Sequence, residues 1–295
     1  MKLPELNLSQ LRTFVAAADR LSFIGAAETV CRSQAAVSMQ IMKLEATVGQ
    51  PLFERHTRRI ALTTAGDTLL PYARKLLQLE HEAGTALRKQ EVVGRVVLGA
   101  PDDYISSLLP PLLERFSRMF AKVEIELVCL QSALLEPMLR KGAIDLAFVT
   151  RSPGLEGQFV RREPMVWVGA QRHATWNKNP LPVALYEHGC VAREYTLAAL
   201  EHIGRPYCST YSSPSLLGIL AMVDAGLAVA ALAECSVPPH LVRLGPEHGF
   251  PPIAPLDIVL IKGRENSSPA VECLANEIML TLNGAHASTT GTGWD

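Results

Sequence analysis

The spacing of apolar residues divides the chain into a helical first part and a second part in which strands and helices alternate. In the first part, apolar residues at helical spacing predict helices over 9–19, from about 23 to 30, and over 34–48. Ser22 and Ser33 stand directly before the second and third helices, where a side-chain oxygen can cap the free backbone N–H groups.

The predicted helix over 34–48 has two faces of different character. Its apolar stripe consists of Val37, Ile41, Leu44 and Val48. Gln34 and Ser38, four residues apart, share another face, with Ala35, Met39 and Met42 beside them. The stripe would dock the helix and leave the other face free for a partner. A basic segment with Arg58 and Arg59 follows, and this order is typical of a winged helix-turn-helix, which presents a helix to the major groove of DNA.

A long helix is predicted next, capped by Thr63 or Thr64 and carrying Pro71, where we expect a bend or irregularity. Residues on alternating steps of four and three form a heptad seam with one polar interruption, namely Leu69, Ala73, Leu76, Glu80, Ala83 and Leu87. The seam fits either a core helix or pairing with a second copy of the chain. We favour the second copy, because the helix lies between two domains and has little of its own to pack on.

Strand-like and helical segments alternate after Gly94, which predicts mainly parallel sheets covered by helices. Strands are predicted at 96–98, 123–129, 144–149, 165–168, 182–185, 207–211, 227–232 and 257–261. Helices are predicted at 105–120, 132–141, 194–203, 214–225 and 270–282. In such folds ligands bind beyond the carboxyl ends of strands. The Ser-, Thr- and Gly-rich tail 284–295 is expected to be disordered.

Composition and charge limit the function classes. A length of 295 residues suggests two or three domains, and 48% hydrophobic residues indicate a large core. The net charge is −1, yet in residues 1–64 the basic side chains exceed the acidic ones by three, which fits phosphate binding at one end. The six cysteines are too scattered for a metal or redox motif. No signal peptide or membrane-spanning run is present, so we expect a cytoplasmic protein without metal, cofactor or membrane partner.

Several segments together resemble the LysR-type transcriptional regulators, over roughly 7–282. The matching pieces are 11–15, Ser22-Phe23 with Ala26-Ala27, Ser33-Gln34, 37–41, Leu44-Glu45, 49–55 (Gly-Gln-Pro-Leu-Phe-Glu-Arg), 62–66, Leu109-Pro110, 142–147 (Gly-Ala-Ile-Asp-Leu-Ala) and 225–229 (Ala-Gly-Leu-Ala-Val). Each piece alone is weak, and the combination is specific. The second half is also similar to the motility and exoenzyme repressors within this family.

The resemblance implies an α/β protein with an N-terminal winged helix-turn-helix, a linker helix and a C-terminal effector domain. That domain would have two Rossmann-like subdomains and resemble type 2 periplasmic binding proteins. The expected limits are 1–63 for the DNA-binding domain, 64–91 for the linker and dimerisation helix, and 92–295 for the effector domain. Within the last, subdomain I covers about 92–163 and 266–283, and subdomain II about 164–265. The family forms homodimers or homotetramers on promoter DNA, usually tuned by a small-molecule effector.

The candidate DNA contacts centre on the third helix. Gln34 can pair with an adenine edge through two hydrogen bonds, and Ser38 can donate or accept. Ala35 and Met39 stand where the family commonly has Pro and Arg, which predicts a different half-site with contacts to thymine methyl groups. Contacts with the DNA backbone are expected from Ser33, from Lys43 and from Thr63 at the start of the linker helix. The wing residues Arg55, Arg58 and Arg59 are expected to contact phosphates or the minor groove.

The resemblance also places an inducer pocket at strand ends facing the domain hinge. The positions are Ala100, Pro101, Asp102, Asp103, Tyr104, Gln131, Ser132, Thr150, Arg151, Arg193, Ser212 and Ser213. Arg151 or Arg193 could hold a ligand carboxylate. Asp102 and Asp103 would repel an anion unless those arginines neutralise them. A cationic, neutral or amphipathic ligand is therefore as consistent with the sequence as an acid, and these residues could instead serve as strand-end caps and hinge ion pairs.

Two other functions compete with effector-controlled regulation. The second half alone would suit a small-molecule solute-binding protein without DNA function, and a regulator of this kind could also be an effector-independent repressor. The basic head and the missing export signal argue against the solute-binding protein. An enzyme is disfavoured, because the chain lacks a nucleophile elbow, a dinucleotide fingerprint, a phosphate loop and a His-Glu-x-x-His motif, and no catalytic residue is predicted.

Overall fold

The computed structural model describes residues 5–55, 60–87, 92–263 and 268–282. The chain divides into two compact units, of which the first comprises Met1–Gln90 with Leu280–Asp295 and the second Glu91–Met279. The predicted disordered tail, 284–295, lies outside the described residues. In the part of the chain that is described, no helix has the length and apolar character needed to cross a bilayer.

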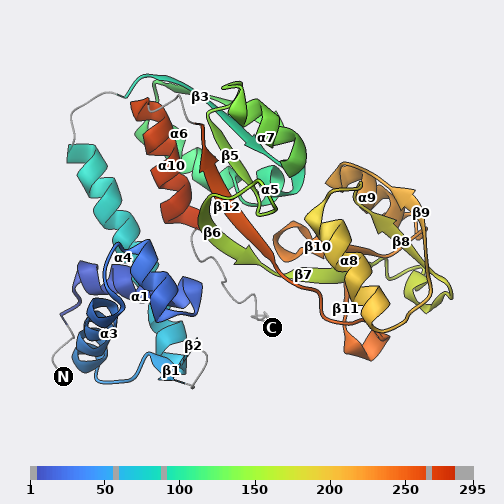
Figure 1. Ribbon diagram of the computed structural model, residues 1–295, viewed down its shortest axis with the longest axis horizontal. Coiled ribbons are helices and arrows are strands. Elements are labelled where there is room, and N and C mark those ends of the chain that lie inside the picture. Colours follow the sequence, from blue (N-terminus) through green and yellow to red (C-terminus); the bar gives the residue numbers. More distant parts are fainter. Residues whose placement is uncertain (1–4, 56–59, 88–91, 264–267, 283–295) are drawn as a thin grey trace, which may run out of the picture. The chain divides into compact units, whose positions relative to one another are not determined.

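The first unit is a winged helix-turn-helix followed by a long helix (Figure 1). Its elements are α1 (Leu8–Arg20), α2 (Phe23–Thr29), α3 (Gln34–Val48), β1 (Phe53–Arg55), β2 (Ile60–Leu62) and α4 (Thr64–Leu87). The predicted caps are confirmed, since the hydroxyls of Ser22 and Ser33 accept the N–H groups of Gly25 and Ala36. Asn7 caps the first helix, and its Oδ1 accepts the N–H groups of Ser9 and Gln10. Local sequence therefore sets where each of these helices begins.

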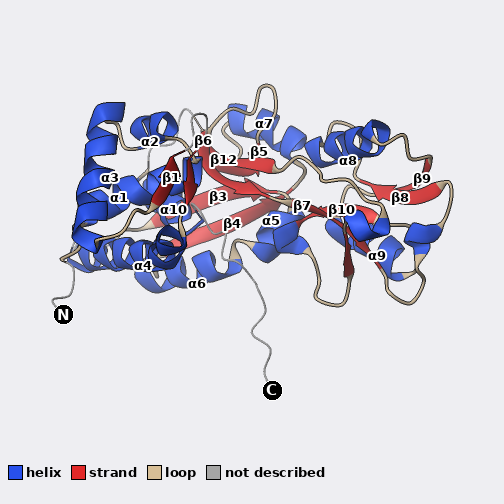
Figure 2. Ribbon diagram, turned by 90° about the horizontal axis from the view of Figure 1, so that it is seen from below, coloured by secondary structure: helices blue, strands red, loops and turns tan. Residues whose placement is uncertain are grey.

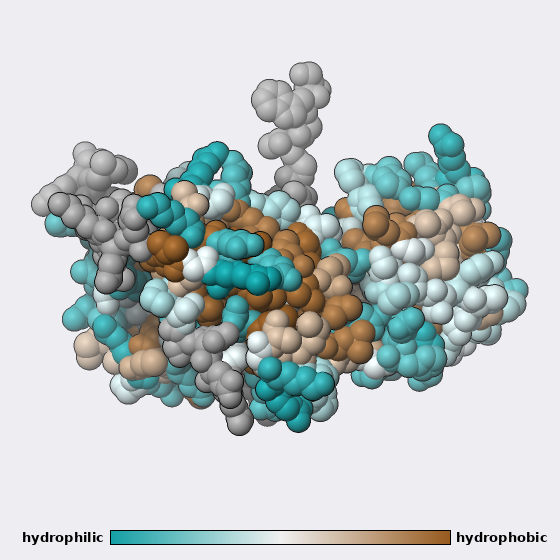
Figure 3. All heavy atoms as spheres, turned by 90° about the horizontal axis from the view of Figure 1, so that it is seen from above, coloured by the Kyte–Doolittle hydropathy of each residue, from teal (hydrophilic) through white to brown (hydrophobic). Residues whose placement is uncertain are grey.

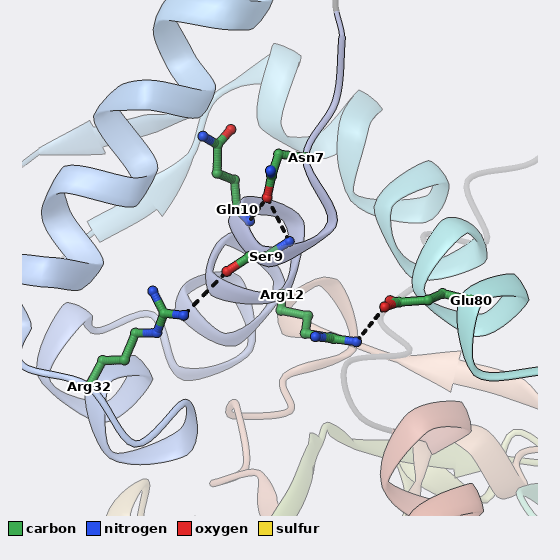
Figure 4. A network of polar contacts seen from close by, with 6 residues as sticks. All are labelled: Asn7, Ser9, Gln10, Arg12, Arg32 and Glu80. Carbon is green, nitrogen blue, oxygen red and sulfur yellow. Dashed lines mark hydrogen bonds and ion pairs between the residues drawn. The ribbon is translucent and has the colours of Figure 1, made fainter. Parts of the chain in front are cut away.

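The helices of this unit enclose one core. Leu11 and Phe14 from α1, Ala27 from α2, and Val37 and Ile41 from α3 are buried in it. One carboxylate fixes the turn into the wing, because Oε1 of Glu45 accepts the N–H groups of Leu52 (2.8 Å) and Phe53 (3.3 Å). Two contacts reach further (Figure 4): Arg32 donates to Ser9 Oγ, and Arg12 pairs with Glu80 of α4 at 2.8 Å.

The helix α4 has two apolar faces, and the predicted heptad seam mixes them. Leu69, Ala73 and Leu77 pack into the core of the first unit, with Ala73 fully buried. A separate stripe at steps of four, three and four is exposed, formed by Tyr72, Leu76, Leu79 and Ala83. The seam available to a partner is thus shifted from the predicted one. Pro71 lies inside α4 without ending it.

Gly66, in the first turn of α4, marks a close approach between two backbones. A Cβ built on Gly66 would lie 2.3 Å from the carbonyl oxygen of Leu52. We expect Gly66→Ala to lower the free energy of unfolding of the first unit by about 1 to 3 kcal/mol, because backbone cannot yield as a side chain does. The matched control is Gly84→Ala in the same helix, where a Cβ meets nothing within 4 Å. In the control, the free energy of unfolding measured in urea should rise by up to about 1 kcal/mol, because alanine favours a helix more than glycine does. Equal changes in the free energy of unfolding for the two variants would refute the close approach.

In its described residues, the second unit contains three sheets and their covering helices (Figure 1). A five-stranded sheet has the order β4-β3-β5-β12-β6, a three-stranded sheet the order β10-β7-β11, and β8 pairs with β9. The strands are β3 (Gly94–Ala100), β4 (Val123–Cys129), β5 (Leu146–Thr150), β6 (Gln158–Glu163), β7 (Met165–Gly169), β8 (Leu181–Leu185), β9 (Tyr207–Ser212), β10 (Ala230–Ala233), β11 (Val242–Leu244) and β12 (Leu256–Lys262). The α-helices are α5 (Asp102–Ser107), α6 (Pro110–Met119), α7 (Ser132–Arg140), α8 (Val191–His202), α9 (Leu216–Asp224) and α10 (Pro269–Leu282).

Layers of helices cover the five-stranded sheet on both faces, and Figure 2 shows α7 and α6 on opposite sides of it. Alternation along each strand decides which residues face which layer. Ala147, Val149 and Val259 pack with Leu135 and Leu139 of α7. Figure 3 shows hydrophobic side chains gathered on the face that it presents. The exposed large apolar residues of the second unit include three on β4, α7 and the turn between them, namely Leu127, Leu130 and Leu134.

Two predictions for this unit are wrong. The sheets are not mainly parallel, since β12 runs antiparallel to β5 and β6, and β7 runs antiparallel to β10 and β11. The single helix predicted over 105–120 is two helices, α5 and α6. Pro110 and Pro111 account for the break, because neither can donate the backbone hydrogen bond that a continuing helix needs. The strands β6 and β11 were not anticipated.

Candidate DNA-binding face and candidate effector pocket

The exposed face of α3 is formed by residues that the core does not use. Val37, Ile41 and Leu44 are fully buried and hold the helix, while Met39 and Met42 are 57% and 55% exposed. Of the predicted contacts, Ser33, Gln34, Ala35, Met39 and Lys43 are exposed and Ser38 is half-buried. The helix thus offers one continuous surface from its N-terminus to Lys43.

Other predicted DNA contacts lie elsewhere or outside the described residues. The wing strands β1 and β2 pair antiparallel, with Arg55 opposite Ile60. The side chain of Arg55 and the whole of Arg58 and Arg59 lie outside the described residues. Thr63 caps α4: its hydroxyl accepts the Gly66 N–H at 3.1 Å and donates to the carbonyl of Pro51 at 2.7 Å.

Two residues join this face that were not among the predicted contacts. Met42, which the helical spacing already placed beside Gln34 and Ser38 but which was not proposed as a DNA contact, extends the exposed row one turn beyond Ser38 and Met39. Arg32 is exposed directly before the Ser33 cap and reaches Ser9 at 3.4 Å. The sequence could have indicated Arg32 as a DNA contact, because it lies beside the N-terminus of α3 and helix N-termini bind phosphates.

A cavity of about 420 Å³ lies in the second unit, at the carboxyl ends of β3, β4 and β5. Its lining includes seven of the twelve predicted positions, namely Pro101, Asp102, Asp103, Tyr104, Gln131, Ser132 and Thr150. It also includes residues that the sequence did not single out, among them Tyr186, Cys190, Pro214, Ser215 and Leu217. Tyr186 directly follows the strand β8, so its position at a strand end was a signal that could have found it.

Five predicted effector residues do not line this cavity. Ala100 is fully buried at the end of β3, and Ser212 and Ser213 precede the lining residue Pro214. The two arginines have other partners. Arg151 lies 3.6 Å from the carboxylate of Asp257, and Arg193 donates to the carbonyl of Tyr186 at 2.8 Å.

Asp102 connects α5 with the start of α9 across the cavity. Its Oδ2 accepts the Ser215 hydroxyl and the Leu216 N–H, both at 2.7 Å. A second link joins the same regions, since the Gln131 amide donates to the carbonyl of Pro214 at 3.3 Å. The carboxylate of Asp102 therefore links α5 to the start of α9 at the edge of the cavity. The Ser215 and Leu216 donors partly satisfy its charge.

The neighbouring Asp103 is in a different environment. Burial, and next the like charge of Asp102, raise its pKa from 3.8 to about 7. The hydroxyl of Tyr104, which is buried, contacts that of Thr150 at 2.6 Å and forms part of the same wall. The cavity therefore holds a carboxyl group that exchanges its proton near neutral pH.

Comparisons with known proteins agree with this arrangement. The profile described as "Bacterial regulatory helix-turn-helix protein, lysR family" matches residues 8–67, and that of the "LysR substrate binding domain" matches 89–280. The transcriptional regulator DgdR of Burkholderia cepacia is 34% identical over 94% of this chain and 95% of its own length. PecT of Dickeya dadantii is 32% identical over 92% and 87%.

A solved structure shows the same fold. CrgA, a LysR-type regulator from Neisseria meningitidis, has a TM-score of 0.66 at 18% identity, over 94% of this chain and 98% of its own. The predicted fold class is confirmed by this match and by the two domain profiles. The chain belongs to the LysR family of DNA-binding transcriptional regulators, with an N-terminal helix-turn-helix and a C-terminal effector-binding domain.

Proposed function

We propose that this regulator places α3 in the major groove of promoter DNA, where Gln34 and Ser38 read base edges. The observation that carries the proposal is the division of α3 into a buried stripe and an exposed face. Ala35, Met39 and Met42 add apolar groups beside Gln34, which suits contact with thymine methyls. Ser33, Lys43, Thr63 and the wing arginines Arg55, Arg58 and Arg59 would contact the sugar-phosphate backbone.

The chain acts, in this proposal, as a homodimer through α4, and two dimers form the homotetramer. The exposed stripe of α4 supports the pairing, since Tyr72, Leu76, Leu79 and Ala83 follow the heptad spacing of a two-helix seam. Two copies side by side would present two α3 helices to successive half-sites of a promoter.

Leu79→Glu tests this pairing. Leu79 is 59% exposed and contributes to no described core cluster, so the change should leave the first unit folded. A charge in an apolar seam repels its copy, and we expect the dimer dissociation constant to rise at least about tenfold. Sedimentation equilibrium measures the constant, and far-UV circular dichroism checks the fold. An unchanged dimer dissociation constant in Leu79→Glu would show that the dimer interface does not include this stripe.

The cavity in the second unit would hold a small-molecule effector, and its occupancy would alter the affinity for the promoter. The hydrogen bonds from Ser215 and Leu216 to Asp102 support this role. Because Asp102 and Ser215 line the cavity, a bound ligand would lie beside these bonds and could strengthen or break them. We infer a regulator working in the cytoplasm, where promoter DNA is accessible, rather than an enzyme.

A binding titration tests the proposed function directly. The full chain is mixed with labelled DNA from upstream of its own gene and with a scrambled duplex, at 50 to 300 mM salt. We expect tighter binding of the upstream DNA at every salt concentration, and a linear fall of log affinity with log salt for both. Equal affinities for the two duplexes throughout would contradict sequence-specific recognition.

A further inference from the structure

The lining of the cavity combines apolar walls with negative charge. Leu130, Leu134, Ala192 and Leu217 provide aliphatic surface, and Tyr104 and Tyr186 provide aromatic surface. Asp102 and Asp103 are the carboxyl groups of the described lining, and no lysine or arginine belongs to it. A ligand carboxylate would therefore meet like charge without a compensating cation.

Neither of the two predicted cations lines the cavity, and both have other partners. Arg151 pairs with Asp257 and lies over the ring of Phe159, with its guanidinium carbon 5.9 Å from the ring centre. Arg193 is held by the carbonyl of Tyr186. Moving either arginine into the cavity would break these contacts, so the carboxylate-binding role considered from the sequence is disfavoured.

One buried polar atom of the lining is left for a ligand, the hydroxyl of Tyr186. The residue is only 8% exposed, and its oxygen has no hydrogen-bond partner among the described residues. Buried polar groups of this kind are rarely left without a partner, which points to a ligand that supplies one. The carboxyl group of Asp103 lines the same cavity, half-buried, and its Oδ1 accepts the N–H of Tyr104 at 2.9 Å.

We propose that the cavity binds a small organic cation, an ammonium group carried on an apolar body. The ammonium donates to Asp103 and to the hydroxyl of Tyr186, and the body lies against Leu130, Leu134 and Leu217. The size of the cavity, about 420 Å³, suits such a molecule. The proposal rests on the proposed function only in treating this cavity as the effector site.

Binding of such a cation would depend on pH, because it needs the carboxylate form of Asp103. The groups that face Asp103 are Asp102 and Tyr104 on α5, Glu163 with its partner Arg161 on β6, Cys235, and Tyr186 and Cys190 after β8. Since its pKa is about 7 without ligand, affinity should be low at pH 5.5, rise through 7 and level off above 8. An ammonium group of ordinary pKa stays charged throughout this range.

The test uses three probes that share a benzyl body and differ at the polar end: 2-phenylethylamine, 2-phenylethanol and phenylacetate. Calorimetry and thermal shift on the full chain at pH 5.5 and 8 measure their binding. We expect the amine to bind at least about tenfold more tightly than the other two at pH 8, and its affinity to fall about thirtyfold at pH 5.5, where only about 3% of a carboxyl group of pKa about 7 is ionised. Tighter binding of phenylacetate, or no binding of the amine, would overturn the proposal.

Variants separate a contact with Asp103 from a general effect on folding. Asp103→Asn should weaken binding of the amine at least about tenfold and remove the pH dependence of that binding. The melting temperature of the protein should not fall, because the change removes a charge held in the cavity wall. Asp224→Asn is the matched control, since this aspartate is exposed on α9 and contacts His240 at the surface; amine binding should not change. Retained amine affinity in Asp103→Asn would refute the contact. If the chain bound the amine but did not prefer its upstream DNA over the scrambled duplex, the cation site would be supported and the proposed function would be refuted.

Discussion

Arg161→Met is expected to lower the free energy of unfolding of the second unit by about 3 to 5 kcal/mol. Arg161 and Glu163 lie on β6, are 6% and 1% exposed, and form an ion pair of 2.5 Å. Oε1 of Glu163 also accepts the N–H of Cys235 at 2.8 Å. Without the arginine, Glu163 would be a buried charge without its ion-pair partner. Glu163 is also close enough to Asp103 for its charge to raise the pKa of Asp103.

The double change Arg161→Met with Glu163→Gln is the matched control. It removes both charges, so most of the lost stability should return, since the cost lies in an unpaired buried charge rather than in a missing contact. Urea unfolding followed by the fluorescence of Trp167, which is 2% exposed on β7, reports on this unit. A loss below about 1 kcal/mol in the single variant, or no recovery in the double variant, would show that the pair does not carry this weight.

Gln34→Ala is expected to reduce affinity for the specific promoter site by about 1 to 3 kcal/mol and to leave binding of random DNA almost unchanged. Gln34 is exposed in the first turn of α3 and contributes nothing to the core, so the fold should persist. The loss comes from hydrogen bonds to one base edge, which random sequences do not offer.

Arg58→Ala provides the contrast for this prediction. A wing arginine neutralises a phosphate whatever the sequence, so its removal should weaken specific and random DNA alike and reduce the salt slope by about one. Fluorescence anisotropy on both duplexes over a salt series distinguishes the two patterns. If Gln34→Ala lost equal affinity on both duplexes, Gln34 would not be reading bases.

The first unit could be predicted closely because its signals are local. The caps at Ser22 and Ser33 and the stripe Val37, Ile41 and Leu44 each depend on residues within a few positions. The seam of α4 could not be assigned from spacing alone, because apolar residues occupy two of its faces. Only the fold shows that Ala73 belongs to the unit's own core.

The second unit was less predictable because its contacts are distant in sequence. Period-two alternation marks β12 as a strand but says nothing of its direction relative to β5 and β6. Strand ends located part of the cavity, including Asp103 and Thr150. Long side chains were the weak point: the sequence places Arg151 at a strand end, but its partner Asp257 comes from β12, more than a hundred residues away.

In the proposed function, the exposed face of α3 selects a DNA sequence. The most direct measurement is to let the full chain and Gln34→Ala each bind sheared genomic DNA of the source organism and to sequence the bound fragments. We expect one shared sequence with two-fold symmetry among fragments bound by the natural chain, and its loss with Gln34→Ala. The same sequence enriched equally by both proteins, or no shared sequence with either, would contradict it.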